Sequence, residues 1–589
     1  MQKLINNPLA AADELLDGLV DAYNGECSKV GTRSIVKNNI PKNKVALLVG
    51  GGAGHEPIYH GMVGKNMADG AACGDIFAAP SPNIIHEATS AIQRGNGVLY
   101  LYGNYAGDNL NFDLGAEISE NEGIRIETIR IADDVASAPA NKKHERRGIA
   151  GLVPIVKIAS AASQTAASLD ELVVTTKKAC LQTKSIGLAI SPGSIPATGK
   201  PTFVLEKGEV GLGMGIHGEA GVAEVALGSA NEMTLQMLEM IITDFNADTD
   251  VADLTKGDEI IFFINSLGAT TMMECLICMR KAREYFDTIG VKIFDTIIGP
   301  LVTCQEMAGM SFSITRVDDE LKDLWSMPCE SLCFSKMQGP NNIQQHSQKK
   351  QLSNKTTTTP NSSTPSQQIR INLSKSSEGL NIEQTRNMLD SVADAIIAAE
   401  PILSDADRAL GDGDHGLGMQ RGFIALKKAI GAPCEKDTLD TLFSNAGNAL
   451  LSTMGGASGV IFGSLFLAGK KTLKGATHFG SHELSHLLEH SLANIVKRGG
   501  AKRGDKTMID ALAPASDVTK IHINDSLKKS ITAAATAAIK GKNDSCEMIA
   551  TTGRAKTLGE KTLGLPDAGA ISVSIILTTM QQFICSSST

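Results

Sequence analysis

The sequence predicts an α/β amino-terminal domain followed by an all-α carboxy-terminal domain, and three observations carry this prediction. Over residues 1–338, short apolar runs alternate with helical patterns, which is typical of a sheet covered by helices. Residues 379–589 are rich in Ala and Leu at helical spacing. Between them, residues 339–378 are almost wholly polar. Such a segment cannot bury enough apolar surface to offset chain entropy, so it predicts a flexible linker.

The strands of the first domain are predicted from apolar runs bounded by glycine. The run KVALLVG (44–50) ends at a glycine cluster, as expected of a buried strand. Further runs of this kind are GVLYLYGNY (97–105), GDEIIFFINSLG (257–268) and VKIFDTIIGP (291–300). A second lobe is expected to open at about 180–200, which gives lobes of about 1–185 and 186–338.

Composition excludes several classes of protein. The 589 residues are too many for one hydrophobic core. A net charge of −9 argues against nucleic-acid binding. No apolar run is long enough to predict a membrane span, and acidic residues near the start argue against a signal peptide. The eleven scattered cysteines fit reduced thiols, so we expect a cytoplasmic enzyme.

Three familiar motifs are weak in this context. SHELSHLLEH contains H-E-x-x-H at His482–His486, a zinc-binding pattern, but a His-rich exposed helix face explains it better. Two G-x-G-x-x-G matches, beginning at Gly213 and Gly411, do not clearly follow a strand in a βαβ unit. In GGAKRGDKT (499–507), Asp505 stands where a phosphate loop requires Lys. A zinc hydrolase, a dinucleotide enzyme and a Walker-type NTPase are therefore disfavoured.

The stretch RALGDGDHGLG (408–418) crowds carboxylates between glycines. Asp407, Asp412 and Asp414 form a D-x4-D-x-D pattern where a helix gives way to a loop. A small divalent cation removes the repulsion between them, and Mg²⁺ leaves coordination positions that substrate phosphates fill. The alternatives are an acidic solvated loop and a calcium loop, although the spacing of a calcium loop is absent. The pattern favours metal–phosphate binding.

Glycine-rich segments beside polar residues predict ligand pockets. MGGASG (454–459) offers successive backbone N–H groups to phosphate oxygens, and PDAG (566–569) forms a turn. GGGAGHEP and GNYAGDNLNF place His55 and Asp108 where backbone closes on a small ligand. GIHGEAG flanks His217 with small residues, where a neutral imidazole can act as base or as nucleophile towards a carbonyl. For each histidine alone, a structural role is the alternative.

Taken in order, these motifs resemble the ATP-dependent dihydroxyacetone kinases of the single-chain, triokinase-like type. GGGAGHEP, GNYAGDNLNF, GIHGEAG and NSLGATTMMEC resemble the ketose-binding domain of that family. LGDGDHG, MGGASG, GDKTMIDAL and GRAKTLGEKTLGLPDAGA resemble its nucleotide-binding domain. The resemblance covers nearly everything outside the linker. It implies two α/β lobes for residues 1–338, an antiparallel helical barrel for residues 379–589, and a homodimer.

The resemblance also implies a role for each motif. His217 would bond covalently to the carbonyl carbon of a small ketose as a hemiaminal, which tethers the substrate and rejects glycerol. Asp108 would act as base towards the terminal hydroxyl, with His55 hydrogen-bonding beside it. The three aspartates would hold Mg²⁺ on the ATP phosphates, and the γ-phosphoryl group would pass in line to the ketose. Further substrate contacts fall on Gly52, Ala53, Gly54 and Gly103. Nucleotide contacts fall on Asp414, His415, Gly416, Leu417, Ala457, Ser458, Gly500, Thr507, Met508, Asp567, Ala568 and Gly569.

Two positions depart from the family's pattern. Gly103 stands where the best-known members have a substrate-contacting Lys, and Ala79 replaces a serine that often precedes PS. The loss of polar side chains predicts a roomier pocket, so the ketose is expected to be dihydroxyacetone or a larger relative such as erythrulose. Two alternatives stay open: an added FAD-AMP lyase activity at the nucleotide site, and a non-catalytic ketose-binding regulator. The regulator would have no need for the aspartate pattern.

Overall fold

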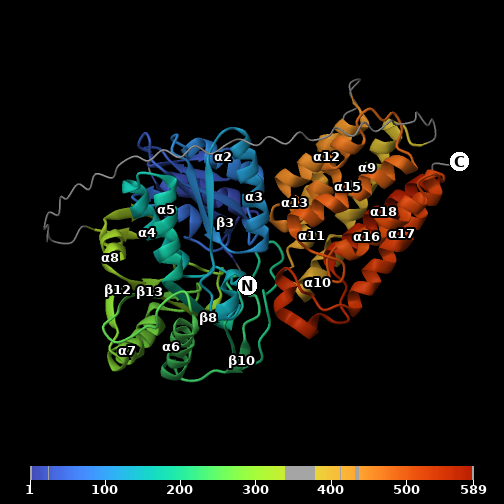
Figure 1. Cartoon of the computed structure of the whole chain (residues 1–589). Helices are drawn as coiled ribbons and strands as arrows, with labels where there is room; N and C mark the ends of the chain where they lie inside the picture. Colours follow the sequence, from blue (N-terminus) through green and yellow to red (C-terminus); the bar gives the residue numbers. More distant parts are fainter. Residues whose placement is uncertain (1–2, 24, 338–378, 412, 432–436, 587–589) are drawn as a thin grey trace.

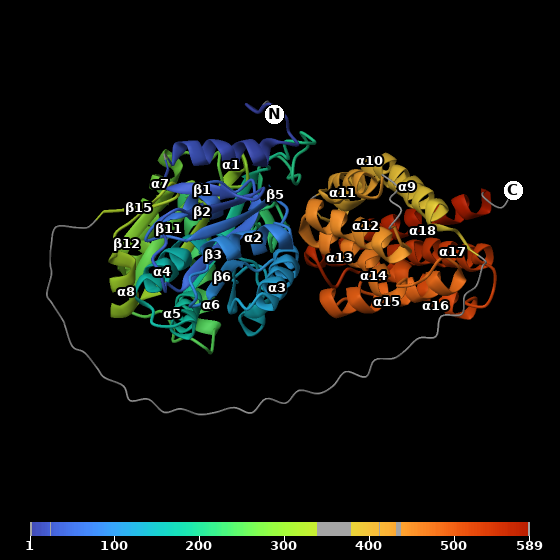
Figure 2. The ribbon, with the colours of Figure 1, turned by 90° about the horizontal axis from the view of Figure 1, so that it is seen from above.

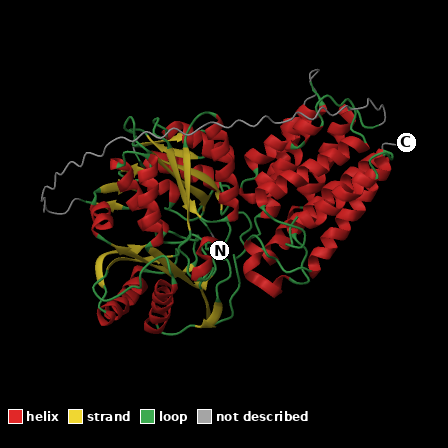
Figure 3. Ribbon diagram, viewed as in Figure 1, coloured by secondary structure: helices red, strands yellow, loops and turns green. Residues whose placement is uncertain are grey.

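Two large sheets covered by helices lie next to a separate group of helices, as Figures 1 and 3 show. Each of the two large sheets has six strands. The computed structural model describes residues 3–23, 25–337, 379–411, 413–431 and 437–586. Strands occur only before residue 338 in the described chain, and the described residues from 379 onwards form helices and turns. The predicted fold class, α/β followed by all-α, is therefore confirmed. The linker predicted at 339–378 lies outside the described residues.

The first sheet has the strand order β1-β2-β5-β3-β6-β7. Its strands are β1 (Cys27–Val30), β2 (Ser34–Lys37), β3 (Ala46–Ala53), β5 (Gly70–Ile76), β6 (Val98–Gly103) and β7 (Ile126–Ile131). The pairs β5-β3, β3-β6 and β6-β7 are parallel, as β-α alternation requires. Helices of this lobe are α1 (Ala11–Ala22), α2 (Pro82–Ile92), α3 (Ala106–Asn121), α4 (Leu152–Thr165) and α5 (Leu169–Leu181).

Both faces of this sheet are buried, which explains the unbroken apolar run in β3. Leu47 and Val49 join the core that contains α4. Ala46 and Leu48 point to the opposite face and join the core that contains α2. Successive side chains of a strand alternate between faces, so a central strand between two helical layers must be apolar at every position.

The second sheet has the order β10-β9-β8-β13-β11-β12 and is mostly antiparallel. Its strands are β8 (Thr183–Ser191), β9 (Glu209–Leu212), β10 (Ala223–Ala226), β11 (Glu259–Ser266), β12 (Lys292–Gly299) and β13 (Ala308–Val317). Its helices are α6 (Ala230–Ala247), α7 (Met272–Ile289) and α8 (Asp319–Ser326). Only β11 and β12 pair in parallel within the described sheet. A small third sheet joins β4 (Gly64–Lys65) to β14 (Cys329–Ser331) and β15 (Ser335–Lys336).

The carboxy-terminal helices surround one apolar core. They are α9 (Ile382–Ala398), α10 (Glu400–Leu410), α11 (His415–Ile430), α12 (Leu439–Thr453), α13 (Gly456–Leu467), α14 (Gly469–Thr472), α15 (Ser481–Gly499), α16 (Ile509–Ile521), α17 (Leu527–Asp544) and α18 (Ala568–Ser586). Of the described helices, only α18 is long and apolar enough to cross a membrane. Half of that apolar stretch is buried inside the protein, where Val573, Ile576 and Leu577 join the core. This is the expected behaviour of a core helix.

The helical domain docks against the first lobe through α3 and α13, which lie side by side in Figures 1 and 2. The N–H of Gly456 donates to the carbonyl of Ala79 over 3.1 Å. Asn111 Nδ2 donates to the carbonyl of Gly456 over 2.7 Å. The α/β domain therefore hydrogen-bonds both the N–H and the carbonyl of Gly456 at the start of α13.

Candidate active site

The glycine cluster at which the first predicted strand was expected to end is part of the strand itself, because β3 continues to Ala53. The glycines are needed because neighbouring chain comes close. A Cβ at Gly51 would lie 2.4 Å from Cε2 of Tyr59, and one at Gly52 would lie 2.8 Å from the backbone N of Ala78. The strand thus delivers Gly54, at φ +102°, and then His55 to the edge of the lobe.

Strained backbone gathers around the same point. Tyr59, Phe77 and Gln305 all have positive φ, between +52° and +63°, which is unusual for residues with a Cβ. The side chain of Phe77 packs on Gly54, and the N–H of Gln305 donates to the carbonyl of Gly54 over 3.0 Å. Such strain persists where surrounding contacts over-determine the backbone, and it is most common at functional sites.

The structure brings two of the predicted catalytic histidines together. The rings of His55 and His217 are 4.6 Å apart at their centroids and meet edge to face. Both are buried, with 1% and 7% of their surface exposed. Nδ1 of His55 lies 2.7 Å from the carbonyl of Thr303, which can only accept, so Nδ1 carries the proton. The Nε2 atom of a neutral His55 is then an acceptor.

Glu219 holds His217 in one orientation. Its Oε1 lies 2.7 Å from Nδ1 of His217, and its Oε2 accepts from the backbone N–H of His217 over 2.9 Å. Because a carboxylate accepts, Nδ1 donates and the lone pair of a neutral ring resides on Nε2. Glu219 was not among the site residues predicted from the sequence, although the H-x-E spacing of GIHGEAG is a visible signal for such a pair.

Tyr105 forms another wall of this site. Its ring meets His217 edge to face at 4.8 Å, and a Cβ at Gly103 would lie 3.3 Å from its Cε2. The space beside Gly103 is therefore partly filled by an aromatic ring. Ala79 is buried, and its carbonyl receives the hydrogen bond from the glycine loop of the helical domain. The two departures from the family's pattern thus lie at the pocket wall and at the domain junction.

Asp108 lies in the first turn of α3, three residues after Tyr105. Burial raises the pKa of the Tyr59 hydroxyl well above its ordinary value, and the nearby charge of Asp108 raises it further. Tyr59 in turn packs on Gly51 of β3. Tyr59 lies near Asp108 and Tyr105 contacts His217, so Asp108 belongs to the same part of the lobe as the histidine pair. The amino end of α3 favours the negative charge of Asp108.

Two of the three predicted metal ligands lie in the described residues, at the junction of α10 and α11. Asp407 is in the last turn of α10, and its Oδ2 accepts from the backbone N–H of His415 over 3.2 Å. Asp414 directly precedes α11. Burial and the charge of Asp407 together raise the pKa of Asp414 to about 7. Asp412 lies outside the described residues, and among those described no set of three metal-ligating side chains is assembled.

The predicted turn Asp567–Gly569 lies beside this carboxylate pair. Burial raises the pKa of Asp567 to about 7, with Asp407 and Asp510 contributing and the N–H of Ala570 opposing. A Cβ at Gly569 would lie 3.1 Å from Cβ of Met508, so the turn contacts the start of α16. Hard oxygen donors that repel one another in this way match the ligand set that Mg²⁺ prefers. The metal centre itself stays a prediction.

This electrostatic arrangement predicts pH-dependent Mg²⁺ affinity. A carboxyl group with a pKa near 7 is protonated below that pH, and a cation must displace the proton to bind. We expect the apparent dissociation constant for Mg²⁺·ATP to rise by about tenfold per pH unit below 7 for each proton displaced. Titration calorimetry in two buffers of different ionisation enthalpy measures this release. An affinity that is unchanged between pH 8 and pH 6 would contradict the prediction.

The remaining nucleotide residues fall on the ends of helices around that centre. His415 opens α11, and its ring joins Ser458 over 3.0 Å and Ser572 over 2.8 Å. Its side chain thus ties α11, α13 and α18 together, and any contact with a nucleotide falls to its backbone. Gly416 and Leu417 follow in α11, Ala457 and Ser458 open α13, Gly500 caps α15, Thr507 and Met508 precede α16, and Ala568 and Gly569 open α18.

An ion pair spans the two domains between the predicted ketose and metal sites. Arg421 Nη1 of α11 pairs with Asp75 at the end of β5, and Nη2 donates to the carbonyl of Met454 over 3.1 Å. The charge of Arg421 also lies close enough to oppose the raised pKa of Asp414. Arg421 therefore contacts the α/β domain, the glycine loop and the surroundings of the metal site at once.

The Asp75→Asn variant tests this junction. Removing one partner of a half-buried ion pair leaves Arg421 uncompensated, so the domains lose alignment. We expect kcat to fall about tenfold, equivalent to about 1.4 kcal/mol, while the binding of ketose alone and of ATP alone is unchanged. Steady-state kinetics and calorimetry measure these quantities. Glu145→Gln is the matched control, because its pair with Lys556 also spans the domains but is exposed and should contribute little. Equal losses in both variants would contradict the assignment.

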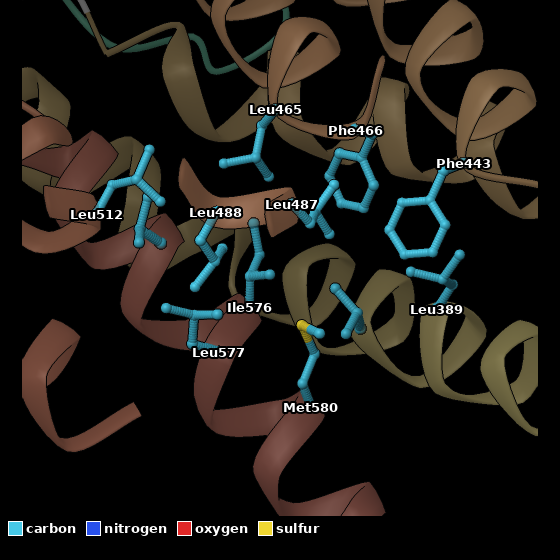
Figure 4. Close-up of a pocket in the computed structure, with 12 residues that line it drawn as sticks. Leu389, Phe443, Leu465, Phe466, Leu487, Leu488, Leu512, Ile576, Leu577 and Met580 are labelled. Atoms are coloured by element: carbon cyan, nitrogen blue, oxygen red, sulfur yellow. The ribbon is translucent and has the colours of Figure 1, made fainter. Parts of the chain in front are cut away.

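Two other places in the helical domain do not form a catalytic site. The His-rich motif lies on α15, and no cluster of three metal-ligating residues occurs there within the described chain. A cavity of about 20 Å³ lies inside the helical group, with room for about one water. Figure 4 shows that its walls are apolar, among them Leu389, Phe443 and Ile576. A cavity without polar groups offers neither acid, base nor metal ligand.

Comparisons with known proteins agree with this geometry. The Dak1 domain model matches residues 17–333, and the DAK2 domain model matches residues 409–582. The chain is 31% identical to L-erythrulose 1-kinase of Mycolicibacterium smegmatis, over 99% of this chain and 100% of that one. It is 30% identical to human triokinase/FMN cyclase, over 99% of both chains.

Solved structures give the same result. The dihydroxyacetone kinase of C. freundii, in native form and in complex with AMP-PNP and Mg²⁺, matches 99% of both chains at 26% identity with a TM-score of 0.51. Both domain models match in order, and three of the whole-length relatives are named erythrulose kinases. The chain therefore belongs to the dihydroxyacetone kinase family and is a short-chain ketose kinase.

Proposed function

We propose that this enzyme transfers the γ-phosphoryl group of ATP to the terminal hydroxyl of a ketose held as a hemiaminal on His217. The observation that supports this most strongly is the buried His217–Glu219 pair, in which Nδ1 is engaged and Nε2 carries the lone pair. A nucleophilic nitrogen among aromatic walls suits addition to a carbonyl carbon, which ketoses have and glycerol lacks.

The other predicted residues then divide the work. Asp108 removes the proton of the terminal hydroxyl as that oxygen attacks phosphorus, and Nε2 of His55 accepts a hydrogen bond from the ketose. Gly52, Ala53, Gly54 and Gly103 shape the pocket through their backbone. The positions of His55 and His217 around β3 support this division, because one rigid strand end and one buried loop hold both rings.

The nucleotide would lie against the helix ends of the carboxy-terminal domain. Asp407, Asp412 and Asp414 would hold Mg²⁺, which when bound offsets the charge of the triphosphate and polarises its γ-phosphoryl group. The backbone N–H groups at the start of α13 would receive phosphate oxygens. The glycine loop that offers them is hydrogen-bonded to the α/β domain, so the same loop faces both substrates.

We infer that erythrulose is preferred over dihydroxyacetone. The support comes from several whole-length relatives near 30% identity that are named erythrulose kinases. The change at Gly103 adds little to this support, because the ring of Tyr105 fills part of the space. One extra hydroxymethyl group changes specificity by about tenfold or more when it gains contacts. Measuring kcat/KM for dihydroxyacetone, glyceraldehyde, D-erythrulose and L-erythrulose with Mg²⁺·ATP tests this. A preference for dihydroxyacetone would remove the erythrulose assignment and leave a glycerone kinase.

A second activity has one specific observation in its favour. The human relative that matches the whole chain is named triokinase/FMN cyclase. Cleavage of FAD to a cyclic flavin phosphate would use the nucleotide site and would not need His217. Incubation of the wild type and of His217→Ala with FAD separates the two chemistries. We further propose that the enzyme acts in the cytoplasm and that it is a homodimer. Sedimentation velocity tests the oligomeric state.

A further inference from the structure

A series of buried charged side chains lies close to His217. Asp134 is fully buried, and its Oδ2 accepts from Nε and Nη2 of Arg147 over 2.9 and 2.7 Å. Nη2 of Arg147 also donates to the carbonyl of Gly213 over 2.9 Å. Asp134 follows β7 of the first lobe, whereas Gly213 follows β9 of the second. Arg147 is thus fixed at the boundary between the two lobes.

The free side of Arg147 faces Glu219 across a single glycine. A Cβ at Gly215 would lie 2.1 Å from Oε2 of Glu219 and 2.8 Å from Nη1 of Arg147. Nη1 is buried and has no hydrogen-bond partner among the residues that the structure describes. Only a glycine leaves open the space between the guanidinium and the carboxylate. Against the effect of burial, the charges of Asp134 and Glu219 raise the pKa of Arg147.

Tyr105 closes the same space from the side of α3. Its hydroxyl is buried without a hydrogen-bond partner in the described part of the chain. Burial and the charge of Glu219 raise the pKa of Tyr105 well above its ordinary value, and Arg147 opposes this. The titratable groups that face His217 and Glu219 are therefore His55, Tyr105, Arg147, Asp134 and the buried Cys304.

We propose that Arg147 is a positioning residue for His217: anchored by Asp134, it holds Glu219 as a carboxylate on Nδ1 and thereby directs the lone pair of Nε2 at the ketose. This inference rests on the proposed function, because it explains how the covalent adduct forms. Arg147 does not touch the substrate. It acts through Glu219, and the lack of a side chain at Gly215 keeps the space between Arg147 and Glu219 open.

The charges of this series balance when the adduct forms. A bond forms between Nε2 and the carbonyl carbon, the π pair of the carbonyl moves to its oxygen, and that oxygen takes a proton from a water molecule, whose hydroxide passes to bulk solvent. The ring becomes positive while its Nδ1 proton stays in the hydrogen bond to Glu219. Asp134, Arg147 and Glu219 carry one net negative charge before the addition, so the positive ring is neutralised without any group moving.

The test compares two adjacent buried arginines. Arg147→Met removes the charge that faces Glu219, and Arg146→Met removes an equally buried charge that pairs with Asp244 instead. We expect Arg147→Met to raise KM for the ketose about 100-fold with KM for ATP unchanged, since misplacement of a reacting group by about 1 Å costs that much. In the pH profile of kcat/KM of this variant, the fall towards low pH should begin at a higher pH than in the wild type, because Glu219 protonates more readily without the cation. Arg147→Lys should restore part of the loss.

Gly215→Ala is the second variant, which separates Glu219 from Arg147 without removing either and should give the same pH shift. Covalent adduct formation is followed in parallel by intact-protein mass spectrometry with ketose alone. If Arg147→Met and Gly215→Ala form the adduct as the wild type does, with an unmoved pH profile, the role of Arg147 is refuted. If the wild type forms no adduct, the covalent part of the proposed function fails instead, so the two failures are distinguishable.

Discussion

Replacing His217 by Ala is expected to lower kcat/KM for ketose phosphorylation by about 10³-fold or more. The imidazole removes the freedom of a small, freely diffusing substrate and fixes its hydroxyl near the triphosphate, and such fixation accounts for several kcal/mol of a typical barrier. The ring is buried, hydrogen-bonds to Glu219, and contacts the rings of His55 and Tyr105. Mg²⁺·ATP binding takes place in the other domain and should be unchanged. Coupled-enzyme kinetics and calorimetry measure the two properties separately.

His144→Ala is the matched control for this variant. His144 lies in the same domain with its side chain 78% exposed, so its loss should leave kinetics and stability unchanged. Circular dichroism and thermal unfolding of all three proteins separate a catalytic from a folding defect. If folded His217→Ala kept more than a tenth of the wild-type kcat/KM, the covalent bond between His217 and the ketose would not account for the rate of phosphorylation.

The second large effect is expected for Asp414→Asn. This change keeps the shape of the side chain but removes a carboxylate beside Asp407, so the charge that attracts Mg²⁺ falls. We expect kcat/KM for ATP to fall by about 10²- to 10³-fold, comparable to the loss of one preorganised electrostatic group. Ketose binding should be unchanged, because it belongs to the other domain. Steady-state kinetics at several Mg²⁺ concentrations measure the effect, and high Mg²⁺ should restore part of it.

Asp394→Asn provides the comparison for Asp414→Asn. Asp394 is an exposed aspartate on α9 that pairs with Lys427, so its loss should not alter Mg²⁺ dependence. Should Asp414→Asn and Asp394→Asn behave alike, the aspartates around residue 412 would not be the metal site. Should Asp414→Asn also lose ketose binding, the division of labour between the domains would be wrong.

Local sequence patterns were sufficient for the fold class and for the histidine pair. Apolar runs predicted β3, β6 and β11 because these strands are buried on both faces, where every position must be apolar. The run of β12 was also predicted, although this edge strand is mostly only partly buried. The helical domain was predicted because its core needs a continuous apolar stripe on each helix. His55 and His217 were identified from the glycines around them, and those glycines prove necessary for close backbone approach.

The remaining features depend on contacts between distant segments, which no local pattern encodes. The glycine segment of β3 stays extended because the Phe77–Ala78 segment and Tyr59 press on it. The second sheet is mostly antiparallel although its strands read like those of the first. The role of Glu219 depends on its contact with Nδ1 of His217. The role proposed for Arg147 depends on its position between the two lobes. The room expected beside Gly103 is reduced by the ring of Tyr105.

The covalent link between ketose and imidazole is tested most directly by nuclear magnetic resonance on labelled material. Protein carrying ¹⁵N-histidine is mixed with a ketose enriched in ¹³C at its carbonyl carbon. The account predicts a one-bond ¹³C–¹⁵N coupling in the wild type and in Asp414→Asn, and none in His217→Ala. Saturating ketose that binds to the wild type without such a coupling would contradict it.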